Sequence, residues 1–190
     1  MGGERMHKKV LALVLVVALM ATSLVGTVAA NRGQTKKEYV DYVFDAVLAN
    51  PVVTVLVDFP SIVIDGYRPP EGVVSCVVTI NGEGYSYPEA FSYNENFHIE
   101  GNMITGDGFM EVTTVLTFNL PGHPKITESI ISQVTGVGTG SLAFEDGTFQ
   151  LTGTKMFNKV EGGGVLLSTQ AGGIDYALHI GQMKGWPFGG

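Results

Sequence analysis

The chain has 190 residues, of which 45% are hydrophobic and only 15% charged, and its formal net charge is −7. This length suits one ordinary domain with a sizeable core. The low content of lysine and arginine excludes a basic surface for nucleic acid or anionic lipid, so we expect neither as a partner.

Residues 1–30 have the layout of a secretory signal peptide. A basic start (Arg5, Lys8, Lys9) precedes an uncharged run over residues 10–30, which ends in the small residues that a signal peptidase requires. An uncleaved anchor formed by residues 10–30 is the alternative, because about twenty uncharged residues can cross a bilayer. Both interpretations predict a secreted or extracytoplasmic protein, whose remaining chain holds 8 basic and 17 acidic residues.

Residues 31–50 are predicted to form a polar lead-in and one amphipathic helix. Thr35 and Glu38 fit a capping box, and Asn50-Pro51 ends the helical pattern. The apolar residues recur at helical spacing: Tyr39, Val40, Val43, Phe44, Val47 and Leu48. We expect this helix to pack on a sheet or to close one end of a barrel.

Residues 51–190 have the texture of an antiparallel β-domain. Short apolar or alternating runs are separated by glycine, proline and Asp-Gly or Asn-Gly turns, which predicts eight to eleven strands. The runs are 52–57, 61–64, 73–80, 85–87, 109–120, 126–134, 141–144, 148–152, 156–160, 164–169 and 174–180. The predicted fold class is therefore all-β and mainly antiparallel, a small closed barrel or a sandwich with one N-terminal helix.

The run from Gly136 to Thr154 is predicted to be a β-hairpin. Glu145-Asp146-Gly147 supplies the turn, with Gly147 at a positive φ that other residues tolerate poorly. Gly136-x-Gly-x-Gly140 lacks the spacing and the following helix of a dinucleotide site, so we interpret these glycines as structural.

This texture resembles lipocalin-like, dirigent-like and allene-oxide-cyclase-like proteins, which share the closed or sandwiched antiparallel architecture. No family motif is matched residue by residue, so the resemblance implies no particular active site.

The segment from Gly84 to His98 is the best candidate for a binding site. Its aromatic side chains alternate with carboxylates and amides, a mixture that suits recognition of a sugar or a protein. The predicted contact residues are Tyr85, Tyr87, Tyr93 and Phe97. The alternative is a pair of ordinary edge strands whose aromatic residues pack inward.

Asp175 and His179 are the weak catalytic candidates. They share one face of the strand 174–180, and they could perform acid–base chemistry if that face lines a lumen. The favoured interpretation places this face in solvent, opposite a core face of Ile174, Tyr176, Leu178 and Ile180. Cys76, the single cysteine, is expected to be a buried thiol, and no metal or cofactor is expected.

The leading hypothesis is an exported, non-catalytic β-domain that binds a small apolar ligand, a glycan or a protein partner at the cell surface. One alternative is a cofactor-independent isomerase or cyclase in a β-barrel. The other is a structural subunit of a surface assembly. A lumen lined by polar residues with a buried ionisable group favours the enzyme, whereas a wholly apolar or filled interior favours binding or a purely structural role.

Overall fold

The structure, a computed structural model, describes residues 39–188, apart from the side chain of Glu145. The predicted signal peptide or anchor and the capping box lie outside the described residues. No helix within residues 39–188 is long and apolar enough to cross a membrane.

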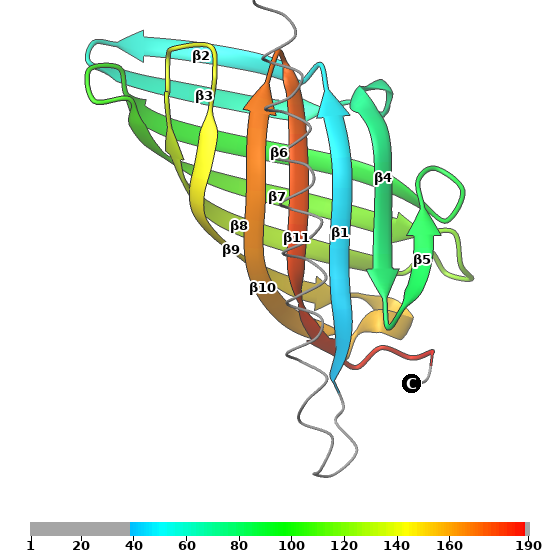
Figure 1. Cartoon of the computed structure of the whole chain (residues 1–190). Coiled ribbons are helices and arrows are strands. Elements are labelled where there is room, and N and C mark those ends of the chain that lie inside the picture. The colour runs from blue at the N-terminus through cyan, green and yellow to red at the C-terminus, as the bar shows by residue number, and fades with distance from the viewer. Residues whose placement is uncertain (1–38, 189–190) are drawn as a thin grey trace, which may run out of the picture. The chain divides into compact units, whose positions relative to one another are not determined.

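The described chain is all-β and antiparallel, as predicted, with eleven strands and two one-turn 3-10 helices (Figure 1). The strands are β1 (Tyr39–Ala49), β2 (Val52–Asp58), β3 (Ser61–Arg68), β4 (Val73–Ile80), β5 (Glu83–Ser86), β6 (Phe91–Asn102), β7 (Asp107–Phe118), β8 (Lys125–Thr135), β9 (Ala143–Gly153), β10 (Glu161–Ala171) and β11 (Ile174–Lys184). The helical turns are η2 (Pro70–Gly72) and η3 (Lys155–Phe157).

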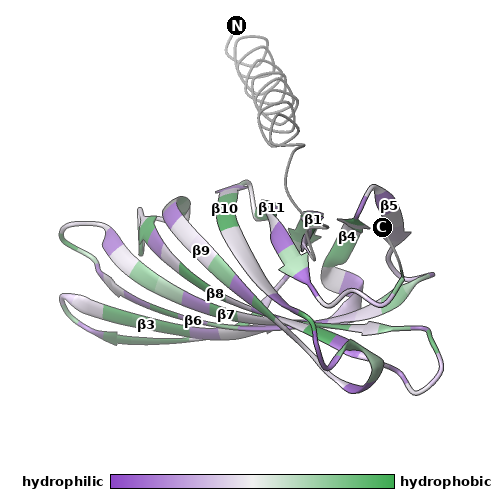
Figure 2. Cartoon of the chain, turned by 90° about the horizontal axis from the view of Figure 1, so that it is seen from below, coloured by the Kyte–Doolittle hydropathy of each residue, from purple (hydrophilic) through white to green (hydrophobic). Residues whose placement is uncertain are grey.

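All eleven strands belong to one sheet, in the order β2-β3-β6-β7-β8-β9-β10-β11-β1-β4-β5. Strands β2, β3 and β6 to β8 run across the view of Figure 1, and β10, β11, β1 and β4 run upright in front of them. The two halves of the sheet face each other, as the view from below in Figure 2 shows. The stacking of Phe44 in β1 on Tyr93 in β6, with ring centroids 6.3 Å apart, crosses the space between them.

The predicted helix over residues 31–50 is wrong for its described part, which is strand β1. Tyr42, Phe44, Ala46 and Leu48 alternate along β1 and are all buried. The opposite face of β1 also holds apolar residues, namely the half-buried Val43 and Val47. Apolar residues on both faces produced the apparent helical spacing. The segment forms a strand because it pairs with a neighbouring strand on each side.

The predicted hairpin turn at Glu145-Asp146-Gly147 is also wrong, because these residues lie inside the continuous strand β9. The register of β9 shifts here against both neighbouring strands, so the segment is an irregularity in the ladder. Gly147 is not among the residues with positive φ. A Cβ added at Gly147 would lie 2.8 Å from Cβ of Leu166, so close packing explains the glycine.

One end of the interior is filled by an aromatic cluster. Trp186 packs on Phe157, with ring centroids 4.9 Å apart, and Phe118 contacts both rings. The run 156–160, predicted as a strand, instead includes part of η3, which directs Phe157 into this cluster. Because aromatic side chains fill this end, the open part of the interior lies towards the other end.

Candidate functional site

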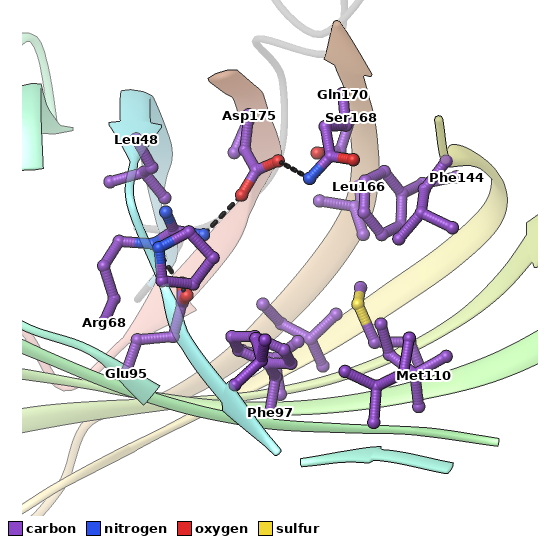
Figure 3. A pocket seen from close by; sticks show the side chains of 18 of the residues that line it. Leu48, Arg68, Glu95, Phe97, Met110, Phe144, Leu166, Ser168, Gln170 and Asp175 are labelled. Atoms are coloured by element: carbon purple, nitrogen blue, oxygen red, sulfur yellow. Dashed lines mark hydrogen bonds and ion pairs between the residues drawn. The ribbon is translucent and has the colours of Figure 1, made fainter. Parts of the chain in front are cut away.

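The interior contains a cavity of about 420 Å³ between the two halves of the sheet (Figure 3). This volume is in the range of small-molecule sites. Of the 24 lining residues, 15 have apolar side chains and six are polar or charged. The apolar members include Phe44, Leu48, Phe97, Ile99, Met110, Val112, Ile130, Phe144 and Leu166, and the polar ones are Arg68, Glu95, Ser168, Gln170, Asp175 and His179.

Arg68 organises the polar end of the cavity. Its Nε donates to Oε1 of Glu95 at 3.0 Å, its Nη1 donates to the carbonyl of Ala49 at 2.9 Å, and its Nη2 donates to Oδ2 of Asp175. The side chain is only 4% exposed. Through these bonds one guanidinium connects β3 to the ends of β1 and β11 and to the interior of β6 (Figure 3).

Each carboxylate of this cluster also accepts a hydrogen bond from a neutral side chain, in addition to the one from Arg68. Tyr93 donates its hydroxyl to Oε2 of Glu95, and Nε2 of Gln170 donates to Oδ1 of Asp175 at 2.8 Å. Burial on its own lowers the pKa of Arg68, but Glu95 and Asp175 together raise it above its usual value. Burial, followed by the charge of Glu95, raises the pKa of Tyr93 well above its usual value. The cluster is therefore a guanidinium between two hydrogen-bonded carboxylates.

His179 lines the cavity deeper in the interior. Its Nδ1 lies 2.9 Å from Oε1 of Glu128, which is fully buried on β8. Its ring packs against those of Phe44 and Phe149, with centroid distances of 4.7 and 5.6 Å. With a carboxylate at Nδ1, the neutral imidazole carries its proton there, which leaves Nε2 as the basic nitrogen. Within residues 39–188, Nε2 has no hydrogen-bond partner.

Two buried polar atoms lack hydrogen-bond partners in the described chain. One is Oε2 of Glu128 itself, and the other is the hydroxyl of Tyr42. Burial, and next the charge of Glu128, raise the pKa of Tyr42 well above its usual value. Burial is also the main cause that raises the pKa of Cys76, which is buried as expected. The middle of the interior thus combines an acidic group with phenol and thiol groups that stay protonated at neutral pH.

The rim of the cavity is formed by connections rich in glycine. Gly138 and Gly140 from the loop between β8 and β9 line it, and both have positive φ. Gly173 of the β10–β11 turn lines it as well. The glycines that resembled a nucleotide motif therefore form a loop at the edge of the cavity.

The four predicted aromatic contact residues are separated by the fold. Phe97 lines the cavity, and Tyr93 is a buried residue that holds Glu95 in place. Tyr85 and Tyr87 lie at the aromatic end, where Tyr85 packs on Phe118 and Trp186, and Tyr87 packs on Phe91. The structure therefore brings two of the four residues to one site.

The favoured interpretation of β11 is wrong, because the face of Asp175 and His179 points into the interior. Both residues line the cavity, and His179 is 3% exposed. Tyr176, assigned to the core, is 44% exposed on the opposite face. The assignment failed because the more apolar face of β11 is the outer one.

Arg68 and Glu128 were not identified from the sequence as site residues, and Glu95 was noted only as one of the carboxylates within the candidate segment from Gly84 to His98. Glu128 carried a signal, because it stands between Ile126 and Ile130 in the alternating buried face of β8. A carboxylate in an apolar register is costly unless it is paired, and so indicates an interior partner. Arg68 carried no such signal, since it precedes two prolines and looks like part of a turn.

Comparison with protein-family models, with curated proteins and with solved structures returned no match. The geometry of the cavity is therefore the basis on which a function can be proposed.

Proposed function

We propose that this protein binds a small, mainly apolar molecule in the cavity between the two halves of its sheet. The observation that carries the proposal is an interior space of about 420 Å³, apolar over most of its lining and ionic at one end. Sites for small molecules have this character, with an apolar wall that contributes affinity and a few polar groups that orient the ligand. A barrel-like container is part of the proposal, and the packing of Phe44 on Tyr93 across the interior supports it.

A glycan or protein partner has less support as the occupant of this site. A sugar requires polar groups along most of its surface, and only six lining residues are polar or charged. An exported location, with residues 10–30 as signal or anchor, also belongs to the proposal and rests on the sequence of residues 1–30. N-terminal sequencing of a cleaved product starting at Asn31 tests that part.

The binding function is tested by a substitution that places a larger side chain in the cavity. Leu166 lines the cavity, whereas its neighbour Leu167 is exposed on the outer face of β10. We expect the protein to bind the neutral dye phenylnaphthylamine with an increase in dye fluorescence, Leu166→Trp to abolish that binding, and Leu167→Trp to preserve it. Dye binding that is equal in both variants would place the dye elsewhere and refute the proposal.

The isomerase or cyclase hypothesis is the second candidate, and the pair of His179 and Glu128 favours it. An imidazole with a free Nε2 in a mainly apolar cavity can take a proton from a bound molecule and return it at another position. No co-reactant is consumed in such a transfer. The test is uptake of deuterium from heavy water next to the carbonyl of undecanone: the protein should accelerate it, and His179→Gln should abolish this while dye binding remains.

The assembly hypothesis has support in the outer face of the sheet. In the strand register Leu167 lies beside Leu178, and Tyr176 lies beside Val47. Leu167 and Tyr176 are 46% and 44% exposed, so apolar groups from three strands meet on this face. Size-exclusion chromatography of the protein and of Leu167→Glu tests this hypothesis. It requires that the original protein elute as an oligomer and that the variant elute as a smaller species.

A further inference from the structure

The polar end of the cavity holds more negative than positive charge. Arg68 is the only lysine or arginine among the lining residues, and it is shared by Glu95 and Asp175. The side chains of these three residues are 4%, 9% and 14% exposed, so water screens their charges weakly. One guanidinium between two carboxylates leaves a net charge of −1 in a mainly apolar enclosure.

Arg68 is poorly placed to bind an anion, although an arginine in an apolar cavity invites that interpretation. Three of its five N–H groups already donate, from Nε and Nη2 to carboxylates and from Nη1 to a backbone carbonyl, so two remain. An anionic head group here would lie close to Glu95 and Asp175, and repulsion between like charges is strong where water is excluded.

A cationic head group finds suitable partners at the same place. An ionised carboxylate offers about four lone-pair sites. Each oxygen of Glu95 and of Asp175 accepts one hydrogen bond from the described chain, so acceptor capacity remains on both groups. An ammonium group can donate three hydrogen bonds and would neutralise the excess charge.

We propose that the cavity selects an amphipathic amine, with its ammonium group beside Glu95 and Asp175 and its apolar part against Phe97, Met110 and Leu166. Figure 3 shows these apolar side chains apart from the ionic cluster, as the two ends of such a ligand require. The inference rests on the proposed binding function and adds the chemical class of the ligand.

The test compares three probes with the same chain and different head groups. Decylamine, decanol and decanoate are titrated, below their micelle concentrations and near neutral pH, against protein that carries bound phenylnaphthylamine. We expect decylamine to displace the dye at a concentration at least ten-fold lower than decanoate, with decanol between them. Equal or tighter binding of decanoate or decanol would overturn the inference while leaving the binding function intact. A protein that binds neither the dye nor any decyl probe would refute both.

Two variants that each neutralise one carboxylate test whether the preference for the amine depends on the cluster. Asp175→Asn and Glu95→Gln each remove one negative charge, and each should reduce the ratio of amine to carboxylate affinity by about ten-fold. Asp45→Asn, on the exposed face of β1, is the control with the same charge change, and it should leave the ratio unchanged. The fluorescence of Trp186, the only tryptophan, checks that each variant is folded. An unchanged ratio in both cavity variants would overturn the inference.

Discussion

Removal of the guanidinium by Arg68→Met should destabilise the fold by about 3 kcal/mol. Methionine replaces most of the aliphatic stem, so loss of packing is a minor part of the cost. The larger part comes from Glu95 and Asp175, which remain in the interior without their cation. Breaking a buried ion pair costs about 3–5 kcal/mol, and Asp175, at 14% exposure, keeps some access to water, which favours the lower value.

The assay is urea unfolding followed by the fluorescence of Trp186. This residue lies in the aromatic cluster with Phe157, whereas Arg68 lies at the cavity end, so its signal reports global unfolding. For a domain of this size, about 3 kcal/mol corresponds to a decrease of roughly 6–12 °C in Tm.

The control is the triple variant Arg68→Met, Glu95→Gln, Asp175→Asn. It removes all three charges while keeping similar shapes, and it should recover most of the lost stability because no charge remains unpaired. A single variant as stable as the original protein, or a triple variant no better than the single one, would refute the account of the cluster as a buried charge network.

Three further predictions concern residues other than Arg68, Glu95 and Asp175. Gly147→Val should destabilise the domain by about 1–3 kcal/mol, because the new side chain would collide with Leu166, and an unchanged melting midpoint would contradict that contact. The pKa of His98 is raised, mainly by its hydrogen bond to Asp65; NMR titration should show this, with a lower value in Asp65→Asn. Its small stabilising contribution should be complete below about pH 6.5 and fade as the pH rises through the raised pKa. Tyr93→Ala should cost about 3–5 kcal/mol in a thermal melt, as for a core aromatic residue, and a negligible loss would restore its role as an exposed contact.

The sequence was sufficient for the fold class because strand patterns are local. The run 73–80 matches β4, and the alternation along 109–120 covers most of β7. Local patterns failed where a strand carries apolar residues on both faces, as in β1. They failed again in β9, where the Asp-Gly pair belongs to a register shift that only the pairing with β8 and β10 defines.

The site was less predictable because its members come from distant strands. Arg68, Glu95 and Asp175 belong to β3, β6 and β11, and no spacing in the sequence connects them. The two faces of β11 were also assigned the wrong way round, because the more apolar face of a strand was assumed to be its buried face. A cavity that holds charge inverts this rule, since the polar face must turn inward to meet its partners.

If the cavity binds a ligand as proposed, selection of that ligand explains the ionic cluster better than stability does. Replacing a buried charge network by neutral groups of similar size is often neutral or stabilising, so folding alone gives little reason to retain Arg68 between two carboxylates. The bond from Arg68 to Ala49 does connect strand ends around the cavity, but a neutral hydrogen-bonded cluster could do the same. The triple variant separates the two roles in one protein. If the cluster serves the ligand, that variant should recover most of the stability lost in Arg68→Met and bind the neutral dye, yet bind decylamine no better than decanoate. If the cluster serves only the fold, the three probes should keep the same order in both proteins.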